Sequence, residues 1–257
     1  MVRGIFLDID GTMVSFKTHR MPDNTKEALM EARRRGVKVF VATGRHFSDI
    51  NNLDNLEFDG YITLNGAYCT ADGKVLFKKS IPRNNVEAFI HYDTTVERVP
   101  CFFVDADSVT ANGVFDITER MMKLVEFPPR PVLDSTAFLD REIFQLTAFF
   151  STEKEPEIMR FLPDCQATRW YPTFADIVAK GIDKSVGIQE VIRRFGLSRE
   201  EIMTFGDGGN DITMLRYAGI GVAMGNAEEE VKQSADYITT SVDDDGVGEA
   251  LRRFGVI

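Results

Sequence analysis

Short apolar segments that end in polar, glycine-containing turns are the main pattern along this chain. The clearest are Gly4–Ile9, Val37–Ala42, Tyr61–Leu64 and Ile202–Phe205. Their apolar positions are continuous rather than alternating, which is typical of strands buried on both faces of a parallel sheet. Amphipathic helical stretches lie between or after several of them. This alternation predicts an open α/β sheet.

Polar residues mark where several of the helices should begin. Asn24 followed by Glu27 predicts a capping box at the start of the first helix. Asp183 is expected to open another helix, which carries a stripe of apolar residues. Two further helices are expected to start near Asn210 and near Asn226. These starts place polar groups at the ends of strands.

The middle of the chain, from about Pro82 to Ala179, has a different pattern, with less regular alternation and clustered prolines. We expect helices at Val86–Val96, Ile117–Val125 and Glu155–Leu162, and strands at Cys101–Val104, Ser108–Ala111, Phe144–Phe150, Ala167–Tyr171 and Asp176–Val178. Helices beside antiparallel strands favour a separate α+β domain. The sequence therefore predicts a core formed by residues 1–81 and 180–257, with a cap at 82–179 inserted between its parts.

Composition and charge restrict the classes of function. Of 257 residues, 44% are hydrophobic and 27% charged, as in a folded globular protein. The net charge of −10 argues against a general nucleic-acid or anionic-membrane surface, but not against a small anionic ligand in one cleft. Three widely spaced cysteines suggest free thiols in a reducing compartment. With no long apolar run, we expect a cytoplasmic protein.

Several polar residues are expected to meet at one edge of the sheet, because ligands bind beyond the carboxyl ends of parallel strands. They are Asp8, Asp10, Thr43, Asn65, Asp207 and Asn210. Carboxylates gathered in this way repel one another unless a cation lies between them, and hard oxygen ligands favour Mg²⁺. The alternative is that each Asp only forms a turn or caps a helix. The whole set at one edge favours the metal site.

These residues lie in motifs that resemble those of the haloacid dehalogenase (HAD) superfamily in its phosphatase form. Asp8-Ile9-Asp10-Gly11-Thr12 resembles motif one, and Ala42-Thr43-Gly44-Arg45 resembles motif two. Lys184 resembles motif three and 206–211 motif four, in the expected order. Together with Asn65-Gly66-Ala67 they resemble the Cof-type, class IIB sugar-phosphate phosphatases. The resemblance extends across the chain and implies a Rossmann-like core with an α+β cap.

The resemblance implies a role for each carboxylate. Asp8 would attack phosphorus, form an aspartyl-phosphate and bind Mg²⁺. Asp10 would protonate the leaving alkoxide and then activate water, while its backbone carbonyl binds Mg²⁺. Asp207 would be a direct metal ligand. Asp211 would support the metal through water, with a plain helix cap as the alternative.

Four further residues would hold the phosphate. Thr43 and the amide of Gly44 would bind its non-bridging oxygens, and Lys184 would supply a cation at a helix N-terminus, where the dipole already favours an anion. Asn210 would bond phosphate or orient Lys184, and its alternative role is an N-cap. Lys180 is a nearby rival for the position of Lys184.

We therefore expect a Mg²⁺-dependent phosphatase that acts on small phosphorylated metabolites, with hexose phosphates as the first choice. Its partner would be a small-molecule phosphate ester, without nucleic acid or membrane, and its state a monomer or small homo-oligomer. One alternative is a phosphomutase of the same fold, similar to eukaryotic phosphomannomutase. Another is a phosphate-binding protein with an idle site.

Overall fold

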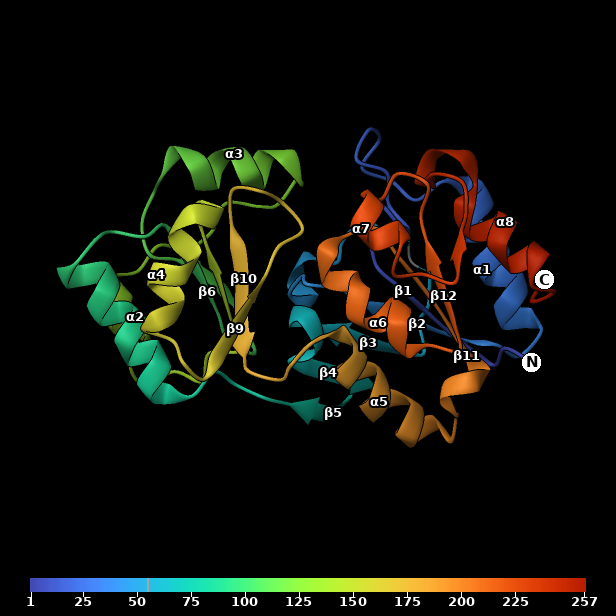
Figure 1. Cartoon of the computed structure of the whole chain (residues 1–257), viewed down its shortest axis with the longest axis horizontal. Coiled ribbons are helices and arrows are strands. Elements are labelled where there is room, and N and C mark those ends of the chain that lie inside the picture. The colour runs from blue at the N-terminus through green and yellow to red at the C-terminus, as the bar shows by residue number, and fades with distance from the viewer. Residues whose placement is uncertain (55) are drawn as a thin grey trace. The chain divides into compact units, whose positions relative to one another are not determined.

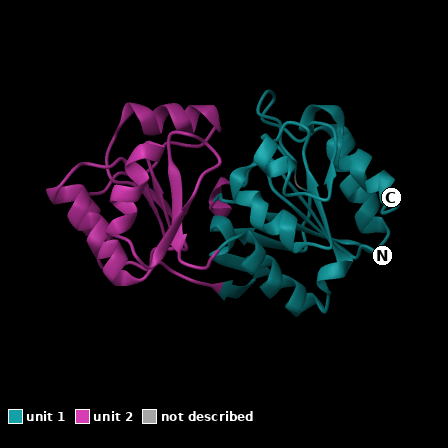
Figure 2. Ribbon diagram, viewed as in Figure 1, with its two compact units in different colours: residues 1–45, 50–77, 183–257 teal, residues 46–49, 78–182 magenta. Residues whose placement is uncertain are grey.

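The computed structural model describes residues 1–54 and 56–257, which form two compact units (Figures 1 and 2). Unit 1 holds residues 1–45, 50–77 and 183–257, and unit 2 holds 46–49 and 78–182. The chain therefore passes between the units four times. The division into a catalytic core of residues 1–81 and 180–257 and an inserted cap of residues 82–179 stays a prediction.

Unit 1 is built on a sheet with the strand order β13-β12-β11-β1-β2-β3-β4-β5. The strands are β1 Gly4–Leu7, β2 Lys38–Ala42, β3 Gly60–Thr63, β4 Tyr68–Ala71, β5 Lys74–Lys78, β11 Ile202–Gly206, β12 Ile220–Ala223 and β13 Tyr237–Ile238. Neighbours from β13 to β3 pair in parallel, and β4 is antiparallel to β3. All four strands expected in this region are present.

Helices cover both faces of this sheet (Figure 1). On one face, α1 (Asp23–Arg34) and α8 (Gly246–Arg253) pack against side chains such as Ile5 and Val39. On the other, α5 (Lys184–Phe195) and α6 (Ile212–Tyr217) pack against residues that include Phe6 and Phe40. The short α7 (Glu229–Lys232) follows β12. Burial on both faces explains the continuous apolar runs, and the predicted fold class is confirmed.

The helix starts agree with the sequence only in part. Asp183 caps α5 as expected, since its side chain accepts hydrogen bonds from the amides of Ser185 (2.8 Å) and Val186 (3.3 Å). The capping box at α1 is wrong: Pro22 is the N-cap, and no side chain caps this helix. Proline fixes its own φ, here −60°, so the helix starts directly after it and Asn24 lies inside the first turn.

The helix expected near Asn226 begins later, at Glu229. Asn226 instead belongs to the loop after β12, where its side chain bonds two other segments: it donates to the carbonyl of Gly11 (2.9 Å) and accepts from the amide of Val242 (2.9 Å). These contacts explain why the chain does not enter a helix at this residue.

Unit 2 contains an antiparallel sheet of order β7-β6-β8-β10-β9. The strands are β6 Cys101–Val104, β7 Val109–Ala111, β8 Gln145–Ala148, β9 Cys165–Thr168 and β10 Ala175–Ala179, and the helices are α2 Arg83–Thr95, α3 Asp116–Leu124 and α4 Glu155–Arg160. Side chains of α2 and α4, such as Phe89 and Ile158, pack on the sheet face formed by Phe103, Leu146 and Ile177. The unit is α+β, as predicted.

One strand of unit 2 lies earlier than predicted. β9 covers Cys165–Thr168 rather than 167–171, because it pairs with β10 from Cys165 opposite Ala179 to Thr168 opposite Asp176. Arg169 then ends the pairing: its guanidinium donates to the carbonyls of Phe150, Pro172 and Phe174. The apolar character of the following residues belongs to a loop.

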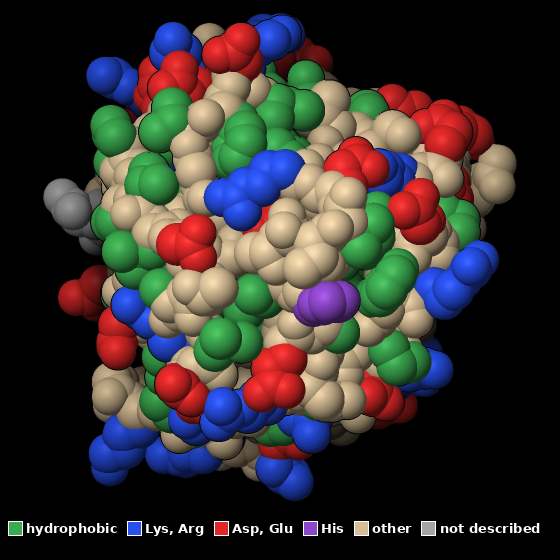
Figure 3. Space-filling model, turned by 90° about the vertical axis from the view of Figure 1, so that its left-hand side faces the viewer, with side chains coloured by type: hydrophobic (Ala, Val, Ile, Leu, Met, Phe, Trp, Pro, Cys, Tyr) green, Lys and Arg blue, Asp and Glu red, His purple; other side chains and the backbone are tan. Residues whose placement is uncertain are grey.

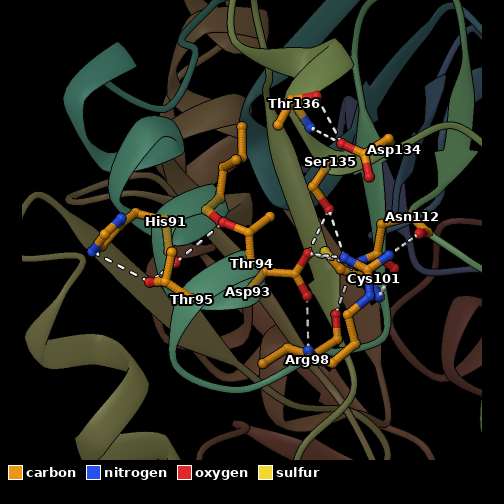
Figure 4. Close-up of polar contacts among 12 residues, drawn as sticks. His91, Asp93, Thr94, Thr95, Arg98, Cys101, Asn112, Asp134, Ser135 and Thr136 are labelled. Atoms are coloured by element: carbon orange, nitrogen blue, oxygen red, sulfur yellow. Dashed lines mark hydrogen bonds and ion pairs between the residues drawn. The ribbon is translucent and has the colours of Figure 1, made fainter.

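A polar network centred on the buried carboxylate of Asp93 ties the end of α2 to the neighbouring strands (Figure 4). The Asp93 carboxylate accepts from the amide of Val99 (2.8 Å) and from the side chains of Arg98, Asn112 and Ser135. The Asn112 amide in turn bonds the backbone of Val99 and of Cys101. Every member is paired, so the network joins these segments into one body.

Two surface properties bear on partners. On the face that Figure 3 presents, acidic and basic side chains are interspersed. Among the described residues, no helix is long and apolar enough to cross a membrane.

Candidate active site

The carboxyl ends of five parallel strands bring polar residues to one edge of the unit 1 sheet. β1 leads into Asp8 and Asp10, β2 into Thr43, and β11 into Asp207. β3 leads to Asn65 in the same way, and β12 leads to Asn226. Parallel strands end on the same side, so residues distant in sequence become neighbours.

Lys184 lies at the centre of this group. It is the first residue of α5, and its side chain is completely buried. Its Nζ donates to Oδ1 of Asp8 at 2.7 Å and to Oδ1 of Asp211 at 2.5 Å. A buried ammonium held by two carboxylates stays charged, because a neutral lysine would leave both carboxylates buried without a counter-ion. Lys184, not Lys180, is thus the cation of the cluster.

Asp207 joins Asp8 and Asp211, with one carboxylate oxygen of each lying within 4.8 Å of the others. Thr12 donates to Oδ1 of Asp207 at 2.8 Å, and Asn226 approaches Oδ2 at 3.3 Å. The turn after β1 passes so close that a Cβ on Gly11, where φ is +81°, would lie 2.1 Å from Oδ2. Only glycine fits at that position.

Asp211 differs from the other two carboxylates in its partners. Its Oδ2 accepts from the backbone amides of Asp207 (2.9 Å) and Gly208 (2.8 Å), while Oδ1 accepts from Lys184. Asp211 therefore holds the loop that carries Asp207. Asp8 and Asp207 are the better candidates for direct metal ligands, because fewer of their acceptor positions are committed to backbone.

Asp10 lies outside this carboxylate group, in a bidentate pair with Arg45. Arg45 Nε donates to Oδ2 of Asp10 at 2.8 Å, and Nη2 donates to Oδ1 at 2.6 Å. Both side chains are largely buried. Such a two-point contact fixes the plane of the carboxylate as well as its position.

The predicted phosphate ligands lie beside these groups. Thr43 is buried, and its Oγ1 accepts from the amide of Arg45 at 3.1 Å, which shapes the turn containing Gly44. Asn210 donates through Nδ2 to Oδ1 of Asn65 at 2.9 Å. Asn210 is not the N-cap of α6, which begins at Ile212, so this alternative is wrong.

Burial dominates the electrostatics of the site. It raises the pKa of Asp8 to about 7, despite the opposing effect of Lys184, and Asp211 and Asp10 raise it further. Burial, with Asp8 and Asp211 nearby, also raises the pKa of Asp207 well above its ordinary value. For Lys184, burial alone would lower the pKa, but Asp211 and Asp8 outweigh it and raise the pKa. When all three are ionised, the carboxylates of Asp8, Asp207 and Asp211 carry more negative charge than Lys184 alone balances.

Sequence reasoning missed the partners that hold these groups. Arg45 and Thr12 lie inside recognised motifs, but their bonds to Asp10 and Asp207 were not predicted. Asn226 had a detectable signal, since it follows a short apolar run, Ile220–Ala223, as Asp207 follows β11. That run was not identified as a strand, so its loop was not assigned to the site.

Comparison with known proteins agrees with this geometry. The family model of haloacid dehalogenase-like hydrolases matches residues 5–251. The putative phosphatase YkrA of Bacillus subtilis is 32% identical and aligns over 98% of each chain. The HAD subclass IIB sugar phosphatase BT4131 is 44% identical with a TM-score of 0.95, covering all of both chains. The phosphatase BT1666 of Bacteroides thetaiotaomicron is 39% identical with a TM-score of 0.91, covering 100% of this chain and 96% of that one.

The unit 1 sheet has a buried lysine among carboxylates at its carboxyl edge, and the family model matches nearly the full length of the chain. The chain therefore belongs to the haloacid dehalogenase-like hydrolases. Within that family it resembles the subclass IIB phosphatases, and it is a phosphoric monoester hydrolase.

Proposed function

We propose that this protein is a Mg²⁺-dependent phosphatase of small phosphorylated metabolites, hexose phosphates first, and that it works through an aspartyl-phosphate. The observation that carries the proposal is the buried group of Asp8, Lys184, Asp211 and Asp207. Its sugar-phosphate part is supported by the likeness to the sugar phosphatase BT4131.

The donor set fits a hard divalent cation. The buried group has three carboxylates, of Asp8, Asp207 and Asp211, and one cation, Lys184. Two negative charges are left over, and all the candidate ligands are oxygens, which suits Mg²⁺. Asp8, Asp207 and the backbone carbonyl of Asp10 would hold the ion. When bound, it would neutralise charge on the phosphoryl group and keep the carboxylates ionised.

The residues of the chain divide the chemistry between them. The Asp8 carboxylate attacks phosphorus as the bond to the leaving oxygen breaks, and Asp10 gives that oxygen its proton. Asp10 then accepts a proton from water, which attacks phosphorus and releases phosphate, regenerating Asp8. Lys184, Thr43, the Gly44 amide and Asn210 hold the phosphate oxygens, so positioning and charge supply most of the rate.

Asp8→Asn tests the chemical part of this proposal. An amide cannot attack phosphorus, so we expect turnover to be abolished while the fold is kept. Wild type should incorporate acid-stable, hydroxylamine-labile phosphate after a rapid quench, and the variant should not. Asp107→Asn, the same change on an exposed loop of unit 2, is the control and should behave as wild type. Near-normal turnover in Asp8→Asn would contradict the covalent mechanism.

A substrate panel tests the metabolic part. We expect Mg²⁺-dependent phosphate release from hexose phosphates, measured with and without chelator, at higher kcat/KM than from nucleotides. Turnover only in the presence of a sugar bisphosphate, with transfer rather than release of phosphate, would favour the phosphomutase alternative.

The buried free thiols of Cys69, Cys101 and Cys165 support our further proposal of a cytoplasmic location.

A further inference from the structure

The loop after β3 has an unusual backbone. Leu64, Asn65 and Gly66 follow one another with φ of +51°, +53° and +97°. This left-handed conformation is free for glycine and tolerated by asparagine, but it is disfavoured for a residue such as leucine. Leu64 and Asn65 are both buried. Strained backbone persists where the surrounding structure holds it in place, and it concentrates at functional sites.

The loop holds the backbone of the Thr43–Arg45 turn. The amide of Asn65 donates to the carbonyl of Thr43 at 3.0 Å, and the amide of Leu64 donates to the carbonyl of Arg45 at 3.2 Å. Extended backbone would not direct both successive amides to the same turn. The strained conformation therefore fixes the segment that carries Thr43 and Gly44.

The same loop sets the position of the start of α5. A Cβ on Gly66 would lie 2.1 Å from the carbonyl oxygen of Asp183, so helix and loop are in direct backbone contact. Gly187, one turn into α5, also approaches the loop: a Cβ there would lie 3.2 Å from the Cα of Gly66. The absence of side chains at these two positions lets Lys184 reach the carboxylates.

The Asn65 side chain reaches a third segment of the site. Its Oδ1 accepts from Nδ2 of Asn210 at 2.9 Å, across 145 positions of sequence. A rigid backbone thus anchors the oxygen that orients the Asn210 amide.

We propose that Leu64–Gly66 is the strained template of the phosphate site and that Asn65 is a positioning residue, which acts on phosphate through Asn210. This inference rests on the proposed function, because it takes Asn210 as a phosphate ligand. Asn65 itself does not contact the substrate in this proposal.

Asn65→Gly separates positioning from stability. Glycine adopts the left-handed conformation without strain, so the thermal midpoint should stay within about 3 °C of wild type or rise. Without the side chain, Asn210 loses its anchor, and the affinity for inorganic phosphate, measured by calorimetry with Mg²⁺ present, should fall about 10-fold. Asp72→Gly is the matched control. Its φ is +52° in an exposed turn, and phosphate affinity should not change.

A double-mutant cycle tests the route through Asn210. If Asn65 acts through Asn210, then Asn65→Gly should add little, under about 2-fold, to the loss of phosphate affinity caused by Asn210→Ala. If the loss of phosphate affinity in the double variant equals the product of the two single losses, Asn65 does not act through Asn210. Unchanged phosphate affinity in Asn65→Gly would overturn the whole inference. Wild type that binds phosphate but hydrolyses no ester would contradict the proposed function instead.

Discussion

At the scale of single residues, the buried carboxylates determine how stability responds to pH. Without metal, Asp8 has a pKa of about 7 in the folded protein and an ordinary value near 3.8 when unfolded. As pH rises between these values, the unfolded chain releases this proton while the folded protein keeps it. Deprotonation therefore favours unfolding, and the contribution of Asp8 to stability falls from about pH 4 to pH 7. Asp207 shifts in the same direction.

Calorimetry of the metal-free protein should reveal this effect. Relative to Asp8→Asn, which does not titrate, wild type should lose several degrees of thermal midpoint between pH 5 and pH 7.5. Since Mg²⁺ needs ionised carboxylates, it should stabilise wild type much more at pH 7.5 than at pH 5. In Asp207→Asn, Mg²⁺ should raise the thermal midpoint at pH 7.5 much less than it does in wild type. Equal stabilisation by Mg²⁺ at both pH values would contradict the assignment.

The sequence predicted site residues that have a local pattern, but not the contacts between residues that lie far apart along the chain. Asp8, Lys184 and Asp207 stand directly at the start of a helix or the end of a strand, where local pattern is informative. The Asp10–Arg45 and Asn65–Asn210 pairs are side-chain contacts across 35 and 145 positions. No periodicity encodes such contacts, because they depend on how strands are ordered in the sheet.

At the scale of elements, prediction worked best for the strands at the centre of the sheet. The central strands β1, β2 and β11 are buried on both faces and left continuous apolar runs. β13 has only two residues and β5 is largely exposed, so neither carries such a pattern. The predicted bounds of β9 were wrong because pairing with β10 and the contacts of Arg169 set the ends of this strand, not its own hydrophobicity.

The polar network in unit 2 gives a prediction about element stability. Asp93→Ala leaves buried donors of Val99, Ser135 and Asn112 without their acceptor, so we expect a loss of about 3–5 kcal/mol in the free energy of unfolding. Asp134→Ala, also in Figure 4, removes only exposed hydrogen bonds from the amide and hydroxyl of Thr136 and should cost about 1 kcal/mol. Urea unfolding compares them.

Activity distinguishes this network from the chemical site. At a temperature where Asp93→Ala is still folded, its kcat should equal that of wild type, because Asp93 has no place in the proposed chemistry. A large loss of kcat in the folded variant would show that the network does more than join α2 to β6 and β7.

At the scale of the whole molecule, the order of the four motifs made the core and its activity recognisable. What the order did not reveal is that residues 46–49, directly after the motif-two turn, belong to unit 2. Within that unit, Asp49 forms a buried two-point ion pair with Arg130 at 2.7–2.8 Å. The partners lie 81 positions apart, so the pair has no local signature.

Unit 2 holds none of the motif residues, and we expect it to govern the choice among leaving groups. Replacing residues 79–181 by a short Gly/Ser linker should keep some activity on a small aryl phosphate while removing preference among hexose phosphates, because binding energy from the sugar is lost. Circular dichroism checks that the remainder is folded. If the folded, shortened chain ranks the hexose phosphates by kcat/KM as the full chain does, then unit 1 determines the preference for the sugar.

The pairing of β1 with β11 has a consequence for biosynthesis. Gly4 lies opposite Ile202, so about 200 residues must be translated before the first strand acquires this neighbour. The continuous 78–182 segment of unit 2 leaves the ribosome entirely within that interval. Until then, β1 offers an open apolar edge to other nascent chains, the kind of surface on which chaperones act. Asp207 is translated about 200 residues after Asp8 and Asp10, so the site that we propose for the metal stays incomplete in the nascent chain until Asp207 has emerged.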